Sequence, residues 1–180
     1  MIKGKMDYSV YEKWVTKSFR WIREERDSHI PHHIQMLGIV DAELRGVRAE
    51  DIFDSSGNPK EDTDGILVLE RHQIKAHLWV LGAYEVVRMI SQRLRENENL
   101  AQPQSIEKVA EVKKLFERVR IPMAKLEPSK RHVKTDFEVA YAGMGPKGLG
   151  WKVAPDTVVY QEELSEKLYE LFTLLWPRMT

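Results

Sequence analysis

The segment from Glu70 to Glu96, ERHQIKAHLWVLGAYEVVRMISQRLRE, carries the side chains best suited to chemistry. A histidine can transfer a proton near neutral pH, and an arginine can bind phosphate or carboxylate through its planar donor fork. Arg71 and His77 lie near the start of this segment, and Glu85 and Arg88 lie in its second half. These four residues are the candidates for a catalytic or binding role.

A helix over this segment would separate two of the candidates. Each residue of a helix advances by about 100° around the axis, so Arg71 lies about 120° from His77. His77, Glu85 and Arg88 fall on one polar stripe, and Glu85 and Arg88 can form an ion pair. Apolar residues fill most other positions, which predicts a helix buried on most sides. We favour a structural or subunit-interface role for the stripe over a catalytic cleft.

Arg71 and His77 have five residues between them, and this spacing resembles the R-x(4–6)-H element of the HEPN (higher-eukaryote and prokaryote nucleotide-binding) ribonucleases. Members of that family are small helical bundles that usually dimerise. Their arginine and histidine act on RNA at the dimer cleft without a metal. The resemblance implies an alternative function, a metal-independent ribonuclease that uses Arg71 and His77. The same spacing also joins Arg26 to His32 and to His33.

Three histidines, His29, His32 and His33, follow acidic residues at positions 24, 25 and 27. Imidazoles together with a carboxylate can bind zinc or a similar ion. Pro31 interrupts a simple helical register here, and the chain has no E-x-x-H motif of the kind found in bundle metal sites. We favour polar residues at a helix junction, with a metal site as the alternative.

A basic stretch, PSKRHVK, contains Lys130, Arg131, His132 and Lys134. Positive side chains can bind phosphate with little sequence specificity. Acidic and basic residues number 28 each, so the net charge is zero, whereas general nucleic-acid-binding proteins usually show a basic excess. We interpret the stretch as a solvated linker and keep a nucleic-acid contact as the alternative.

A glycine-rich stretch, GMGPKG at 143–148, fits the pattern G-x-G-x-x-G. The dinucleotide-binding form of this motif requires a helix after the loop, but alternating apolar residues typical of a strand follow here. We therefore predict a hairpin tip that presents Met144 and Lys147 to a partner, and we expect no cofactor. The motifs G-x-S-x-G and H-E-x-x-H are also absent, which favours a function without catalysis.

The hydropathy pattern predicts a mainly α protein, a bundle of about five helices with one β-hairpin at about 134–153 inserted before the last helix. Residues 1–180 suit one helical domain with the hairpin as an appendage. The predicted helices span about 7–27, 31–45, 69–96, 105–120 and 156–176, and Pro122 ends or bends the fourth. Ser9 and Glu12 have the spacing of a capping box at the start of the first helix.

The composition limits where the protein acts and how. No cysteine is present, which excludes disulfides and thiolate sites and favours a reducing cytoplasm. No segment approaches the roughly 20 apolar residues that span a bilayer. The sequence therefore predicts a soluble helical interaction protein that acts as a homo-oligomer, most simply a dimer. We expect its contacts at Trp14 and Trp21, which lie at the boundary between the apolar and charged sides of the first helix, and at Met144 and Lys147.

Overall fold

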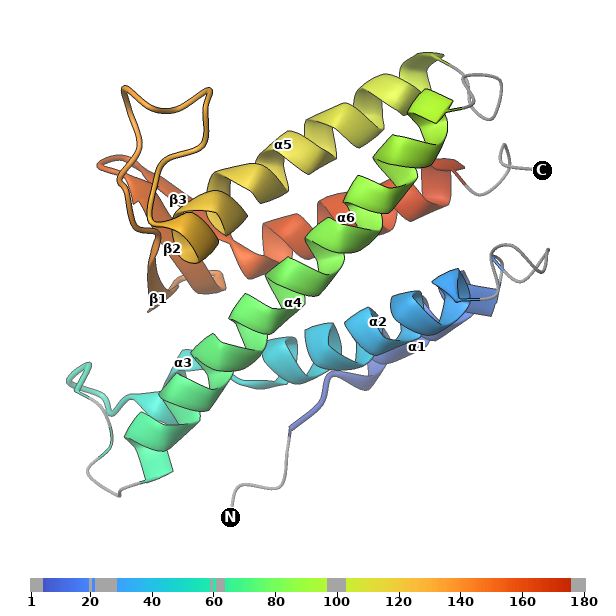
Figure 1. The fold of residues 1–180 in the computed structure, drawn as a ribbon. Helices are drawn as coiled ribbons and strands as arrows, with labels where there is room; N and C mark the ends of the chain where they lie inside the picture. Colours follow the sequence, from blue (N-terminus) through green and yellow to red (C-terminus); the bar gives the residue numbers. More distant parts are fainter. Residues whose placement is uncertain are drawn as a thin grey trace.

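The structure is a computed structural model, and it describes residues 5–19, 21, 29–58, 60, 64–96 and 103–175. These residues form six helices and one small sheet, so the protein is mainly α, as the sequence predicts (Figure 1). In chain order the elements are α1 (Tyr8–Phe19), α2 (Ile30–Gly46), α3 (Ala49–Ile52), α4 (Asp64–Glu96), α5 (Pro103–Lys125), β1 (Tyr141–Gly145), β2 (Gly148–Ala154), β3 (Thr157–Tyr160) and α6 (Gln161–Leu175).

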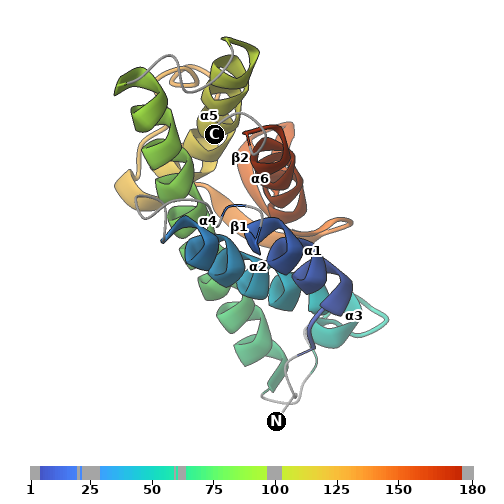
Figure 2. The same cartoon turned by 90° about the vertical axis from the view of Figure 1, so that its right-hand side faces the viewer.

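The helices α1 and α2 lie side by side and run in opposite directions (Figures 1 and 2). Their close approach depends on Gly38 of α2. A Cβ atom at this position would lie 2.2 Å from the Cβ of Trp14 on α1, far inside contact distance. Only a residue without a side chain allows the two backbones to pack at this separation.

Asp7 caps the start of α1. Its carboxylate accepts the backbone N–H groups of Ser9 and Val10 at 3.0 and 3.3 Å, which satisfies two donors that a helix N-terminus leaves free. This corrects the predicted capping box, because the capping side chain belongs to Asp7 rather than Ser9.

The longest helix, α4, crosses α2 and then runs beside α5 (Figures 1 and 2). Trp79 joins these three elements in the core. Its indole N–H donates to the carbonyl oxygen of Leu37 on α2 at 2.9 Å, and its ring lies against Phe116 of α5 with centroids 6.0 Å apart. The middle of α4 is therefore central, as its apolar residues predict.

The helices α5 and α6 complete the bundle. The helix α5 continues through Pro122 as far as Lys125, so the proline does not end it. The leucines spaced along one side of α6 are all fully buried, which confirms the row read from the sequence: Leu164, Leu168, Leu171 and Leu175.

The strands form one antiparallel sheet in the order β1-β2-β3, beside the end of α5 and the start of α6 (Figure 1). A tight turn joins Gly145 to Gly148, and Gly148 adopts a positive φ of 83°, which glycine permits. Trp151 of β2 is fully buried and pairs across the sheet with Val159 of β3.

The boundaries of the predicted hairpin need two corrections. The first strand begins at Tyr141, because residues 134–140 form turns and bends that connect it to the loop after α5. A third strand, β3, occupies the positions that we expected to begin the last helix, and α6 starts at Gln161. Val158, Val159 and Tyr160 favour extended backbone, and their strand pairs with β2, which places Val159 in the core.

Candidate functional site

The outer face of α4 exposes a row of large apolar side chains. Leu67, Ile74 and Leu78 are 44%, 59% and 64% exposed. At about 100° per residue these three positions fall within about 40° of one another on the helix surface. They form one stripe on the side of α4 opposite the buried residues Trp79, Ala83 and Val87. We call this row the α4 stripe.

The stripe is exposed because α4 is longer than its neighbours can cover. At 33 residues it extends for about 50 Å, and its second half is the part that runs beside α5. The sequence predicts a helix that is buried on most sides. The middle of α4 agrees with this prediction, and the exposed face is the one that carries Leu67, Ile74 and Leu78. The sequence signal for such a surface is a long helix with apolar residues on more sides than the other helices of the bundle can cover.

Three of the charged candidates lie on or beside this face. Glu85 and Arg88 form the predicted ion pair, with Arg88 Nε 2.6 Å from Glu85 Oε2, and both side chains are about half exposed. Arg71 lies between Leu67 and Ile74 and is exposed. It forms no ion pair with any described residue. The face thus combines an apolar row with Arg71, which has no ion-pair partner among the described residues, and with the exposed pair of Glu85 and Arg88.

His77 lies about 20° around α4 from Arg88, at the edge of this face that contacts the sheet. Its Nδ1 is 2.7 Å from the carbonyl oxygen of Gln73, so Nδ1 carries the proton and donates this hydrogen bond. Its ring packs edge-on against Trp151 of β2, with centroids 5.9 Å apart. His77 therefore contacts the hairpin, whereas Glu85 pairs with Arg88. Arg71 and His77 lie on the same helix, about 120° apart around its axis.

The three histidines of the metal alternative are exposed around the start of α2. His32 and His33 have ring centroids 6.3 Å apart, and His29 precedes the helix. In the described ranges, no three His, Asp or Glu side chains gather closely enough to hold an ion. The acidic residues at 24, 25 and 27 lie outside those ranges, as does Arg26 of the second Arg–His spacing.

The two tryptophans expected at an interaction surface are covered by the chain itself. Trp14 packs edge-on against Tyr169 and Phe172 of α6, and Trp21 packs against Phe172. Both are nearly fully buried. This is a correction, because α6 rather than a partner supplies the second surface at these positions.

The hairpin tip forms one wall of a pocket of about 410 Å³. Lys147 is exposed there, and Met144 is half-buried on β1. His72 of α4 lines the same pocket and is otherwise buried. Burial, with a smaller effect of the Lys75 charge, lowers the pKa of His72 to about 4. No sequence spacing indicates this histidine, because its burial depends on distant segments.

The basic stretch lies in the loop between α5 and β1, where Lys130, Arg131 and Lys134 are exposed. Asp136 fixes the end of this loop. Arg118 of α5 donates to both carboxylate oxygens of Asp136 at 2.7 and 2.9 Å, and the carboxylate is fully buried. Burial raises the pKa of Asp136, but the hydrogen bonds from Arg118 and Thr135 outweigh it and hold the pKa below its usual range. The loop is therefore held in place rather than being a free linker.

Comparisons with protein-family models, with curated proteins and with solved structures found no match to this chain. Among the helices described, none combines the length and apolar character needed to cross a membrane.

Proposed function

We propose that this protein is a non-enzymatic interaction protein that acts as a homodimer through the outer face of α4. The observation that supports the proposal is the α4 stripe, Leu67, Ile74 and Leu78, which leaves three large aliphatic side chains about half or more exposed. An exposed apolar row on a folded protein is typical of a protein–protein contact, because solvation of such a surface is unfavourable.

The spacing along this face is that of a helix pair. The positions 67, 71, 74, 78, 81 and 85 alternate steps of four and three residues, which is the repeat that keeps one seam facing a partner helix. Leu81 is half-buried and adds a further apolar position to the seam. Gly82 is exposed beside it, and a Cβ there would lie 3.6 Å from Leu37 of α2.

A second copy of this chain suits the seam in one orientation. A two-fold contact places the same surface on both partners. In an antiparallel pair centred on Leu78, each Leu78 meets its copy, and Ile74 meets Leu81 of the second copy. Arg71 then lies opposite Glu85 of the second copy at both ends of the apolar row. Arg71, which has no ion-pair partner among the described residues, would then share the Glu85 carboxylate with Arg88, and this charge complementarity favours the antiparallel orientation.

The test is the molecular mass of the purified protein in solution, measured by light scattering or sedimentation. We expect a concentration-dependent dimer for the wild type. Leu78→Glu places a charge at the centre of the seam and should give a monomer with an unchanged circular dichroism spectrum. Leu126→Glu is the matched control, because Leu126 is 66% exposed but lies at the end of α5. A monomeric wild type, or equal dissociation by both variants, contradicts the proposal.

We further infer that the protein acts in the cytoplasm. The inference is supported by the absence of cysteine, since proteins of oxidising compartments often depend on disulfides. Fluorescence microscopy of a tagged full-length chain tests it, and export from the cell would contradict it.

A further inference from the structure

A concave pocket of about 380 Å³ lies between the second half of α5 and the loop that follows it. Ile121 and Pro128 supply apolar lining, and the first residues of the basic stretch form part of the wall. Small-molecule sites in proteins commonly have this combination of volume, apolar lining and a few polar groups. The pocket is on a different element from the α4 stripe, and the proposed dimer does not use it.

The charge of this pocket is positive although the chain as a whole is neutral. Four Lys and Arg residues line it against two Glu residues, so the lining has a net charge of about +2: Lys114, Lys125, Lys130, Arg131, Glu117 and Glu127. Both glutamates already have partners. Glu117 pairs with Lys113 at 3.2 Å, and Glu127 pairs with Lys125 at 3.6 Å.

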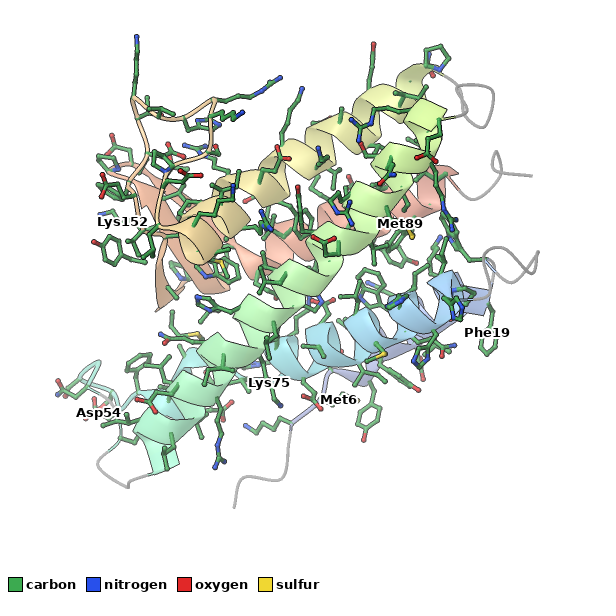
Figure 3. All side chains as sticks on the ribbon, viewed as in Figure 1. Met6, Phe19, Asp54, Lys75, Met89 and Lys152 are labelled. Atoms are coloured by element: carbon green, nitrogen blue, oxygen red, sulfur yellow. The ribbon has the colours of Figure 1, made fainter. Side chains whose placement is uncertain are left out.

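Three of the cations are left for a ligand. Within the described ranges, Lys114, Lys130 and Arg131 form no ion pair. In Figure 3, long side chains that end in nitrogen extend outward from the loop between α5 and β1. An arginine fork and two ammonium groups around one concave surface are suited to an anion with several oxygens.

A neutral donor accompanies these charges. Ser129 lines the pocket and is more than nine-tenths buried, yet its hydroxyl makes no hydrogen bond to any described residue. The hydroxyl oxygen is not itself fully enclosed, so water or a ligand in the pocket can reach it and form the missing hydrogen bond. The hydroxyl of Ser129 is therefore placed to donate to a ligand in the pocket.

The loop that carries these groups is ordered before any ligand binds. The Arg118–Asp136 pair anchors its end to α5, and the backbone N–H of His132 donates to the carbonyl oxygen of Ser129 at 2.8 Å. Preorganised donors bind more tightly than mobile ones, because less conformational entropy is lost on binding.

We propose that this pocket binds the phosphate group of a small phosphorylated molecule, with Arg131, Lys130 and Lys114 on the phosphate oxygens and Ser129 donating from the floor. A phosphate offers enough oxygens for all four donors, whereas a single carboxylate offers two. The remainder of the ligand would lie on Ile121 and Pro128. A small ligand suits the pocket better than a polynucleotide, because a polynucleotide needs an extended basic track and the chain has no basic excess.

The experiment titrates the full-length protein with inorganic phosphate, pyrophosphate and glycerol phosphate, with acetate as the carboxylate probe. Binding is followed by calorimetry and by the NMR signals of residues 114–132. We expect saturable binding of the phosphate probes, tighter than about 1 mM for the best of them, and none for acetate. Arg131→Ala should weaken binding by at least about tenfold, and Ser129→Ala should weaken it less.

The control is Lys134→Ala, which removes the same charge from the same loop but outside the pocket lining. It should leave the affinity within about twofold. Equal losses in Arg131→Ala and Lys134→Ala would show only a diffuse charge effect and would overturn the site. The absence of saturable phosphate binding, or binding of a short RNA far tighter than that of pyrophosphate, would also overturn the proposal.

Discussion

Trp14 of α1 donates its indole N–H to the carboxylate of Asp41 on α2 across 2.8 Å, in the fully buried space between α1, α2 and α6. The same carboxylate accepts hydrogen bonds from Ser165 and Gln161 of α6, both at 2.7 Å, and from Arg45 at 3.3 Å. A buried charge with four donors is stable because each lone pair has a partner. Asp41 therefore joins three helices at one point.

Asp41→Asn should destabilise the fold by about 2–4 kcal/mol. The substitution removes the negative charge that strengthens all four hydrogen bonds. It also replaces one acceptor oxygen by an NH₂ group, which cannot accept a hydrogen bond from the neighbouring donors. Urea unfolding followed by circular dichroism measures the effect. The control is Glu43→Gln, which removes another carboxylate of α2, one that pairs with the exposed Lys75 at 2.6 Å. Glu43→Gln should lower the free energy of unfolding by less than about 1 kcal/mol. Similar losses for both would contradict a special role for Asp41.

Gly38→Ala should lower the free energy of unfolding by about 1–3 kcal/mol, because the new methyl group would overlap the Cβ and Cγ of Trp14. The loss is the net effect, because the overlap outweighs the gain of about 1 kcal/mol that alanine normally brings to a helix interior. Thermal unfolding provides the measurement. Gly143→Ala is the comparison, since a Cβ at Gly143 meets nothing within 4 Å. A Gly38→Ala protein as stable as the wild type would show that the helices can separate without loss.

His72 should make the protein less stable as the pH falls from 6.5 to 4. The unfolded chain binds a proton near the ordinary histidine pKa of 6.5, whereas burial lowers the pKa of His72 in the folded protein to about 4. Stability from this residue is therefore complete above pH 6.5 and lost on acidification, by up to about 3 kcal/mol. Urea unfolding at several pH values should give a shallower dependence for His72→Gln than for the wild type.

Carboxylates such as Asp136, whose pKa is lowered, add their own loss of stability toward lower pH, but they are common to both proteins. The difference between wild type and variant therefore isolates His72. The exposed His32 supplies a matched control, and His32→Gln should keep the wild-type dependence. If the stability of His72→Gln depends on pH as steeply as that of the wild type, His72 is not the group that titrates.

The proposed dimer predicts which residues meet at its two-fold axis. Because the chain has no cysteine, Leu78→Cys introduces a single thiol. Under mild oxidation it should form a disulfide-linked dimer rapidly, since the two Leu78 backbones would lie within disulfide reach of each other. Leu126→Cys, equally exposed, should crosslink slowly. Non-reducing gel electrophoresis compares the two.

Charge reversal tests the ends of the same contact. Arg71→Glu places like charges opposite each other and should weaken the dimer by about tenfold, and adding Glu85→Arg should restore it. Sedimentation at several concentrations measures both effects. If the wild type dimerises but neither the crosslink nor the charge rescue is seen, the dimer uses a different register, and only the antiparallel arrangement is wrong.

Local pattern in the sequence predicts much of this fold. The period of apolar residues predicts the helices around Trp79, Val109 and Leu168, because a helix repeats its buried face whatever it packs against. The spacing of Glu85 and Arg88 likewise predicts their ion pair, since both residues lie on adjacent turns of one helix. The strand β3 was missed because β2, rather than local preference, stabilises it.

The sequence by itself determined a mainly α chain with a small sheet before its last helix, a neutral charge and no thiol chemistry. Only the tertiary structure decided which apolar faces are covered. It buried Trp14 and Trp21 under α6, left Leu78 exposed, and turned His77 toward Trp151. The physical reason is that periodicity identifies a face that avoids water, whereas the element that covers it comes from a distant part of the chain.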